Sequence, residues 1–325
     1  MVPSIYNERS NQMSHNVETM AYSGERPWHS LGNAVSNDLT PEEMMIASGT
    51  NWTVSKHPMY SRIGENEVLL SRQSLFRDSD NTELDIIGGD DWNVTQNSEA
   101  FAFFKEFVER GEMQMETAGS LQNGKIVWVL AKVNKEFNLF NGDKVEGRLL
   151  FSNFHKYGFS RDIRFTPTRV VCNNTLTMAL NGKADKVFKA SHRVVINNEI
   201  IKETLGIVEK KMTEYEELAT FLGSKQYNNE SVKEFFNEVF PKISKISVEK
   251  ELSKNAKASV LALEHQPGVE FAPHSWWQAA NAVTYVTDHL MGRTEDARVS
   301  NMWYGQVKDL KLRAMTLALD YANKS

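Results

Sequence analysis

A β-hairpin signal near the middle of the chain constrains the fold more than any other feature. The dipeptide Asn123-Gly124 stands between two extended runs, 115–121 and 126–133, which contain many β-branched and aromatic residues. Asn-Gly suits the tight turn in which both central residues take a positive φ. The two runs are therefore expected to pair as antiparallel strands joined at this turn.

The segments around this hairpin predict one compact unit. An amphipathic helix over 98–110 precedes it, and two more extended runs follow at 148–154 and 163–171. The Asn173-Asn174-Thr175 corner then has the residue types that cap a helix, so a short apolar helix is expected after it. The predicted order of elements is α-β-β-β-β-α.

The N-terminal part is expected to be less regular. Residues 1–25 are polar and aperiodic, which is typical of a flexible arm. Thr40-Pro41 predicts the start of a short helix, since Thr caps and Pro fits the first turn. Alternating runs at 52–60 and 67–72 predict another hairpin, and the acidic stretch 76–91 is expected to loop outward.

Helical periodicity dominates the chain after residue 191. The expected helices cover 195–225, 231–240, 250–263, 276–291 and 302–322. The predicted fold class is therefore α+β, an antiparallel, hairpin-rich sheet with a crossing helix, followed by an all-helical C-terminal region. The expected divisions are a flexible arm over 1–25, a core domain over 26–190 and a helical region over 191–325.

The charges of the chain are segregated. The formal net charge is −5 and the sequence pI about 6.0, so the whole chain is not basic as nucleic-acid-binding proteins usually are. However, the segment 78–116 holds eleven acids against two bases, and the segment 148–193 holds nine bases against two acids. This asymmetry predicts a two-faced surface, or copies that meet acid to base in a homo-oligomer.

The basic segment also contains the best candidate binding residues. Aromatic and cationic side chains alternate between Phe151 and Arg169, a pattern typical of proteins that stack bases on rings and hold phosphates with Lys or Arg. The competing interpretation is that the aromatic residues belong to the core and the bases to a solvated face. The candidate nucleic-acid-binding residues are Arg148, Lys156, Tyr157, Phe159, Arg161, Arg164 and Arg169.

Signals for covalent or metal chemistry are weak. The single cysteine, Cys172, excludes an internal disulfide and favours a reducing cytoplasm. The eight histidines form no HExxH pattern, and no GxxxxGK[ST] loop is present. We expect no cofactor and no metal, although the carboxylates of the acidic stretch leave a two-metal nuclease open. No apolar run is long enough for a membrane span or a secretory signal.

Four separated motifs resemble one family. They lie at 27–32 (PWHSLG), 116–120 (ETAGS), 166–176 (TPTRVVCNNTL) and 281–289 (NAVT, then Asp288-His289). In this order they resemble the phage/plasmid-like proteins grouped as domain of unknown function 932, over roughly 26–315. The resemblance implies a phage or plasmid setting in a host cytoplasm and supplies no activity. The element order is also loosely similar to that of phage single-strand annealing proteins.

These observations predict a phage- or plasmid-encoded protein of DNA metabolism. It would bind single-stranded DNA without covalent chemistry, as in annealing or recombination. The alternative is a protein-interaction factor that engages a host or phage protein through its acidic segment. A metal-dependent enzyme is the third possibility.

Overall fold

The computed structural model describes residues 17–24, 31–88, 92–140, 142–169, 174–175, 189–190, 198–242, 252–291 and 306–325. Its largest element is an eight-stranded sheet with the order β10-β9-β8-β7-β6-β1-β2, in which β11 also pairs with β9. The strands are β1 (Val17–Ser23), β2 (Asn33–Val35), β6 (Met113–Leu121), β7 (Ile126–Leu139), β8 (Asp143–Phe154), β9 (Arg161–Arg169), β10 (Asn174–Thr175) and β11 (Lys189–Ala190). Every pair is antiparallel except β1 with β2. The predicted α+β class is confirmed.

The central hairpin forms where the sequence predicts it. Strands β6 and β7 close at the pair Leu121 and Ile126. Asn123 and Gly124 both take positive φ, 56° and 85°, as does Gln122. The tolerance of Asn and Gly for this conformation therefore sets the register of the sheet.

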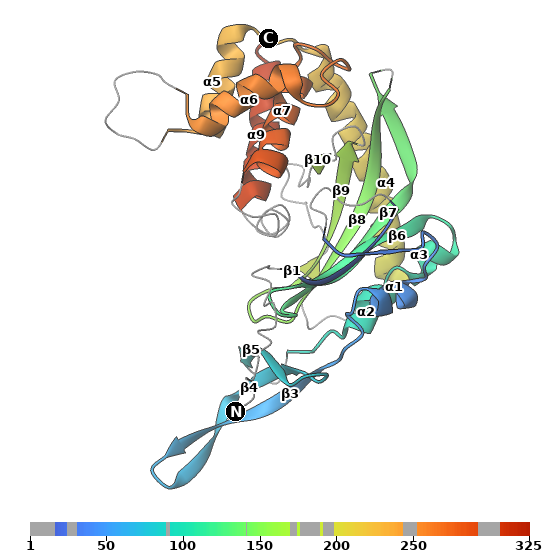
Figure 1. The fold of residues 1–325 in the computed structure, drawn as a ribbon, viewed down its shortest axis with the longest axis vertical. Coiled ribbons are helices and arrows are strands. Elements are labelled where there is room, and N and C mark those ends of the chain that lie inside the picture. The colour runs from blue at the N-terminus through green and yellow to red at the C-terminus, as the bar shows by residue number, and fades with distance from the viewer. Residues whose placement is uncertain are drawn as a thin grey trace, which may run out of the picture.

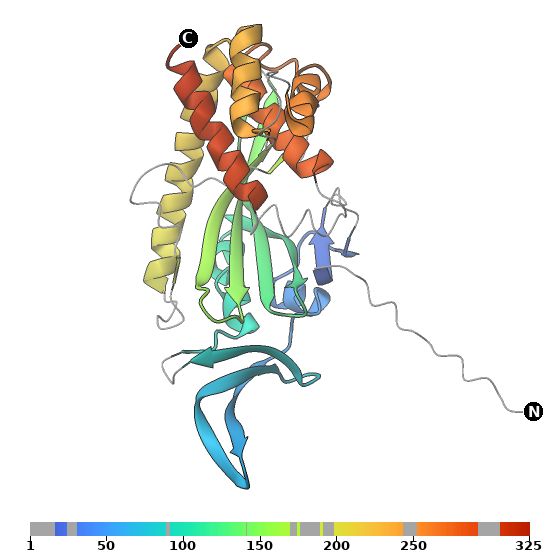
Figure 2. The ribbon, with the colours of Figure 1, turned by 90° about the vertical axis from the view of Figure 1, so that its left-hand side faces the viewer.

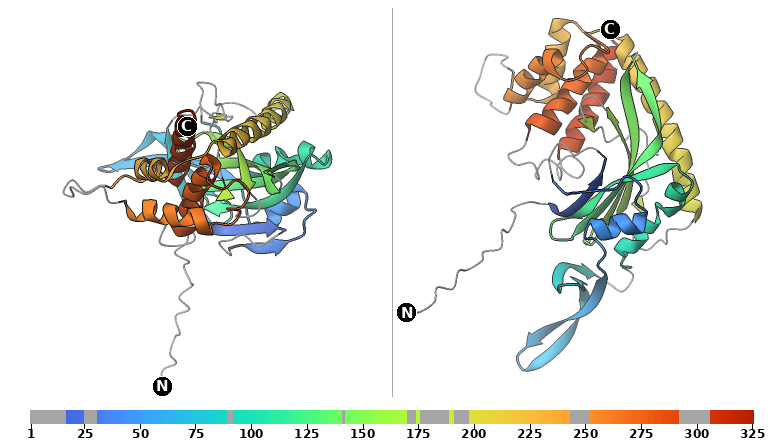
Figure 3. Two further views of the ribbon diagram at one scale, coloured as in Figure 1. Left: turned by 90° about the horizontal axis from the view of Figure 1, so that it is seen from above. Right: turned by 45° about the vertical axis from the view of Figure 1, so that its right-hand side comes forward.

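Helices cover one face of this sheet (Figure 3). They are α1 (Pro41–Ala47), α2 (Asn97–Ala102), α3 (Lys105–Glu109) and α4 (Asn198–Ser224). The expected capping box of α1 is present between Thr40 and Glu43. The single helix predicted over 98–110 is divided into α2 and α3 at Phe103 and Phe104, whose rings are both buried in the core below.

The other helices form a bundle beside one end of the sheet (Figure 1). They are α5 (Asn229–Val239), α6 (Lys254–His265), α7 (Trp276–Tyr285), the π-helix η1 (Val286–Leu290) and α9 (Gln306–Ala322). Helix α4 joins the two parts, because Val208 and Met212 pack in the core of the sheet while Ala219 and Leu222 pack in the core of the bundle. The helical region thus shares a helix with the sheet.

A second sheet projects from the opposite end of the molecule (Figure 2). It has the order β3-β4-β5, formed by Val54–Ile63, Asn66–Arg77 and Thr82–Gly88. The hairpin predicted at 52–60 and 67–72 is therefore present and longer than expected. The outward loop predicted at 76–91 is wrong for the part that forms β5, because this strand pairs with β4 and buries Leu84 and Ile87 in a small core.

Two further predictions differ from the structure. Val17–Ser23 belongs to the sheet as β1, so the arm predicted over 1–25 does not extend through these residues. Asn174–Thr175 pairs with β9 as a short strand, where a helix cap was predicted. The apolar residues 176–180 of the predicted helix lie outside the described residues.

Within the described part of the chain, none of the helices combines the length and the apolar character that crossing a membrane requires.

Candidate nucleic-acid interface

The turn between β8 and β9 carries two exposed aromatic rings. Tyr157 is 56% exposed and Phe159 is 46% exposed. The Phe159 ring stacks on the buried ring of Phe154, with centroids 5.3 Å apart and planes at 24°. The ammonium nitrogen of Lys156 lies 4.8 Å from the Phe159 centroid. The turn therefore offers ring surface and a cation within one short segment.

Buried polar groups fix the base of this turn. A nitrogen of the His155 ring lies 2.9 Å from the side-chain oxygen of Asn97, and the Asn153 amide donates to the Thr95 carbonyl at 2.9 Å. Asn153, near the end of β8, and His155, directly after it, are both fully buried. Because such hydrogen bonds are costly to break inside a protein, the turn is held rigidly on the sheet.

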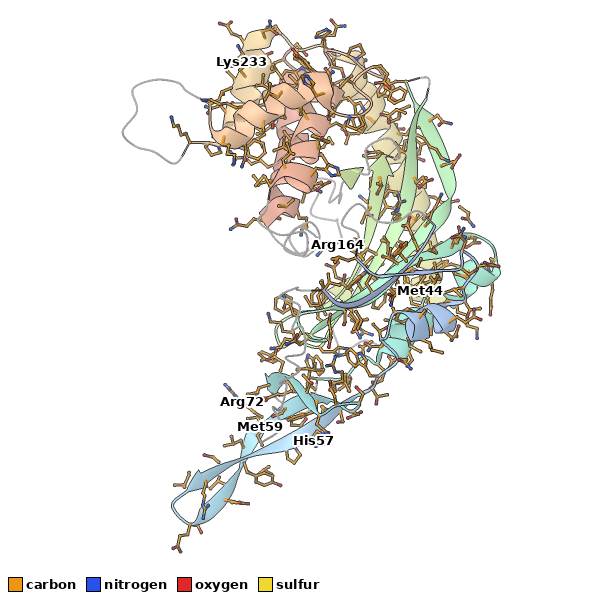
Figure 4. The ribbon with its side chains drawn as sticks, viewed as in Figure 1. Met44, His57, Met59, Arg72, Arg164 and Lys233 are labelled. Carbon is orange, nitrogen blue, oxygen red and sulfur yellow. The ribbon has the colours of Figure 1, made fainter. Side chains whose placement is uncertain are left out.

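Tyr157 connects the turn to the projecting sheet. Its backbone N–H donates to Asp85 on β5 at 2.8 Å. Its hydroxyl oxygen lies 3.5 Å from the position that a Cβ on Gly88 would take. Gly88 is the cross-strand partner of Arg72, and residues that pair directly point to the same face of a sheet. The exposed Arg72 therefore lies on the face of β4 and β5 that Tyr157 approaches. Figure 4 labels Arg72 on the projecting sheet.

Lys125 adds a third cation beside the turn. It belongs to the β6–β7 hairpin turn, and its carbonyl accepts the backbone N–H of His155 at 2.9 Å. Within the described ranges, Arg72, Lys125 and Lys156 have no carboxylate at ion-pair distance. We call the set Arg72, Lys125, Lys156, Tyr157 and Phe159 the turn patch.

Arg148 lies outside the turn patch and is ion-paired with two carboxylates of the same chain. Its guanidinium contacts Glu116 with two nitrogens, at 2.5 and 2.6 Å, and Glu146 at 3.1 Å. Burial alone would lower the pKa of Arg148, but the two carboxylates outweigh burial and hold this pKa above its ordinary value. Arg148 points away from α4, since the neighbouring Gly147 faces Met212 of that helix. This arginine joins β6 to β8 and is not an exposed phosphate contact.

The remaining predicted arginines also lie outside the turn patch. Arg164 is ion-paired with Asp162 on its own strand. Arg161 is buried, and burial lowers its pKa while the charge of Glu99 on α2 opposes that shift. Arg169 ends β9, and its side chain is outside the described part. The structure thus gathers Lys156, Tyr157 and Phe159 on one turn, whereas Arg148 and Arg164 are ion-paired and Arg161 is buried.

Sequence reasoning missed Arg72 and Lys125 as members of the site. Arg72 was counted only as the end of a predicted strand, and Lys125 only as part of a turn. Lys125 could have been included, because it directly precedes β7. The first residue of β7, Ile126, pairs with Phe154, the last residue of β8 before the β8–β9 turn. Nothing in the sequence places Arg72 beside Tyr157, since the contact between the two sheets joins Asp85 to Tyr157 across 72 residues.

Carboxylates of the acidic segment 78–116 have partners within the chain. Asp80 is ion-paired with Arg77, Glu106 with Arg110, and Glu116 with Arg148. The hydrogen bonds of Arg77 hold the pKa of Asp80 well below its usual range. Among the described residues, no group of three or more His, Cys, Asp or Glu side chains is placed to hold a metal ion.

The fold defines an α+β protein in which one long helix joins an antiparallel sheet to a helical bundle. A sequence comparison then shows its family. The family described as a domain of unknown function (DUF932) matches residues 87–303, which is more than half of the chain, so the chain belongs to this family. The membership of this family that the sequence motifs indicated is confirmed over these residues. No curated protein matches the chain, and no solved structure matches it.

Proposed function

We propose that this protein binds single-stranded nucleic acid at the turn patch. Tyr157 and Phe159 stack on bases, and Arg72, Lys125 and Lys156 contact phosphates. The observation that supports this most is the exposure of two rings beside cations that no described carboxylate neutralises. Base stacking on an aromatic ring contributes about 1–3 kcal/mol per base, and it needs bases that are free of a duplex.

The proposed biological role follows the sequence motifs. We infer a protein of phage or plasmid DNA metabolism that acts in the host cytoplasm and holds single strands for annealing or recombination. Binding of this kind needs no covalent step. It is tolerant of sequence, because every base has a π face while base edges are not read.

A salt series with a fluorescent oligonucleotide tests the proposal. Three phosphate contacts predict that log K falls with log salt at a slope of about −2, since each contact to a single strand contributes about −0.7. Arg72→Ala or Lys156→Ala should weaken binding and reduce the magnitude of this slope by about 0.7 each. Lys233→Ala, on α5, is the matched control and should change neither value. Absence of binding at low salt, or equal binding by all variants, contradicts the proposal.

The alternative from sequence, a protein-interaction factor acting through its acidic segment, has less support. Asp80, Glu106 and Glu116 are engaged by arginines of the same chain. Affinity for a host or phage protein together with no oligonucleotide retention would favour this alternative.

A further inference from the structure

The outer half of the projecting sheet has an open strand edge. Strand β4 pairs with β5 through residues 72–77, whereas β3 accompanies β4 to the tip of their hairpin. Among the described residues, 66–71 of β4 therefore have a neighbouring strand on one side alone. All six are exposed, and this part of the hairpin extends away from the rest of the molecule (Figure 2). The open side of β4 is thus accessible to another strand.

This edge lacks the residues that usually block strand addition. Natural edge strands are protected by charged residues, lysine above all, and by proline. Residues 66–71 read Asn-Glu-Val-Leu-Leu-Ser, with a single charge at Glu67 and no proline. The outer edge of β3, in contrast, carries Lys56, Pro58 and Arg62. An added strand would therefore pair with β4 and not with β3.

A register shift in the hairpin leaves the open side of β4 usable. The shift lies between Pro58 and Tyr60, opposite residues 70–72. Arg72 belongs to this stretch and still pairs with Gly88 of β5 on the open side. The backbone of β4 can therefore form a ladder on this side despite the shift.

The apolar residues of this edge match a second copy of the same edge. When residues 67–71 of two copies pair antiparallel with Leu69 opposite itself, Val68 of each copy stands opposite Leu70 of the other. The flanking pairs are then polar, with Glu67 opposite residue 71. Apolar pairs directly opposite each other stabilise a ladder. The next registers, two residues away, would set Leu69 against Glu67 or Ser71 and lose this match.

The same register extends an apolar row across both hairpins. Leu69 is 62% exposed and its direct partner on β3, Tyr60, is 59% exposed. Residues that pair directly point to the same face of a sheet. Two edges joined at Leu69 would therefore align both leucines and both tyrosines on one face. A two-stranded hairpin is marginally stable alone, and more strands with an apolar face stabilise it.

We propose that two copies of this chain join through residues 67–71 of β4, antiparallel about Leu69, and form one four-stranded sheet. The contact uses the same surface on both copies, so it closes as a two-fold dimer. Because the hairpin projects from one end of the molecule and the strands run antiparallel, the two bodies lie at opposite ends of the shared sheet (Figure 1). This dimer goes beyond the proposed function and does not depend on it.

Two substitutions of Leu69 test the register. Leu69→Lys sets two lysines opposite each other in the dimer, Leu69→Glu sets two glutamates, and like charges directly opposite are destabilising. Light scattering coupled to size exclusion should show wild-type protein at about twice the mass of one chain, 37.0 kDa, and each variant at the mass of one chain. A one-to-one mixture of the two variants pairs lysine with glutamate and should restore the dimer. This rescue is expected only if residue 69 meets itself.

The control is Leu261→Lys in α6. Leu261 is 64% exposed, which is close to the exposure of Leu69, so the same change of chemistry is made on another surface. This variant should keep the wild-type mass. Circular dichroism checks that every variant is folded.

Cross-linking locates the contact independently of charge. Leu69→Cys should form a disulfide between copies under mild oxidation, because Cα atoms directly opposite in an antiparallel ladder are about 4.5–5.5 Å apart, within disulfide range. Ile63→Cys, 64% exposed at the tip of the same hairpin, should not, since the two copies of residue 63 would stand about 20 Å apart along the shared sheet. Wild-type protein, whose one cysteine is Cys172, reports the background.

Wild-type protein that stays at the mass of one chain at all concentrations overturns the proposal. A Leu69→Lys or Leu69→Glu protein that keeps the wild-type mass does so too, as does a mixture of the two that restores no dimer. Equal cross-linking of Leu69→Cys and Ile63→Cys would also contradict the register. Oligonucleotide affinity, measured separately, reports on the turn patch alone.

Discussion

Tyr157 lies against Gly88, with its hydroxyl oxygen 3.5 Å and the nearest ring carbons 3.7 Å from where a Cβ of residue 88 would stand. The ring of the β8–β9 turn thus rests on a strand of the projecting sheet. This contact brings Arg72, the cross-strand partner of Gly88, to the aromatic residues. The turn patch therefore depends on how the two sheets meet.

Substitutions at Gly88 should affect binding through the position of Tyr157. In Gly88→Ala the added methyl meets the ring at ordinary van der Waals distance, so oligonucleotide affinity should be unchanged. In Gly88→Leu the larger side chain needs the space that the Tyr157 ring fills and should displace the ring. Loss of about 1.4 kcal/mol of stacking would weaken oligonucleotide binding by roughly tenfold, which is the largest effect expected. Titration of a labelled oligonucleotide measures the affinity of each variant. Equal affinity of the two variants would contradict the placement of Tyr157 in the interface.

Gly119 should be required by close packing inside the large sheet. A Cβ there would stand 2.2 Å from the Thr19 carbonyl oxygen and 2.3 Å from the Trp128 ring. Gly119→Ala should therefore lower the free energy of unfolding by about 1–3 kcal/mol or more. Gly206→Ala is the matched control, because nothing lies within 4 Å of that position in α4. It should stabilise the protein by up to about 1 kcal/mol through helix propensity. Urea unfolding measures both, and equal effects would contradict this packing.

Lys311 of α9 and Asp288 of η1 form an ion pair whose two side chains are fully buried. Burial lowers the pKa of Lys311, and the nearby Asp288 opposes that shift. Lys311→Met leaves a buried carboxylate without its lysine and should cost about 3–5 kcal/mol. Adding Asp288→Asn should recover part of this loss, because it removes the buried negative charge that Lys311 balances. Chemical unfolding of the two variants checks the pair, and a Lys311→Met protein as stable as wild type would show that it contributes nothing.

Tyr227 should make stability fall at high pH. Its hydroxyl donates to Gln278 at 2.8 Å, and burial, with a smaller effect of Glu264, raises its pKa from 10.0 to about 12. Between these two values the unfolded chain has lost the proton that the folded chain keeps, so unfolding is favoured as pH rises. The stability that the neutral hydroxyl contributes is fully present below pH 10.0 and is lost up to about pH 12. Urea unfolding over this range should show a smaller fall for Tyr227→Phe, and identical pH profiles would refute the shift.

Turns, helix caps and helical periodicity were predicted correctly from the sequence where neighbouring residues alone determine the structure. The Asn123-Gly124 turn, the Thr40–Glu43 capping box and the long helix α4 all follow from neighbouring residues. Strand β5 was missed because it is acidic and because its two buried apolar residues, Leu84 and Ile87, are three positions apart and so do not show the strand period. Its core exists only when β3 and β4 fold beside it.

The site was only partly predictable for a related reason. Tyr157 and Phe159 stand out in sequence, and their turn presents them. Arg148 looked equally suitable, yet its carboxylate partner Glu116 comes from a strand two positions away in the sheet. Charge counted along a chain does not reveal which cations are already paired, because strand pairing decides that.

Replacing the two rings tests the central claim most directly. Tyr157→Leu with Phe159→Leu keeps apolar bulk and removes the π faces, whereas Tyr157→Phe with Phe159→Tyr keeps both rings. If the rings stack on bases, the leucine variant should bind a single-stranded oligonucleotide at least about fivefold more weakly, since one stacking contact is worth about 1–3 kcal/mol. The ring-preserving variant should bind like wild type. Equal affinity of the leucine variant and the wild-type protein would contradict the account.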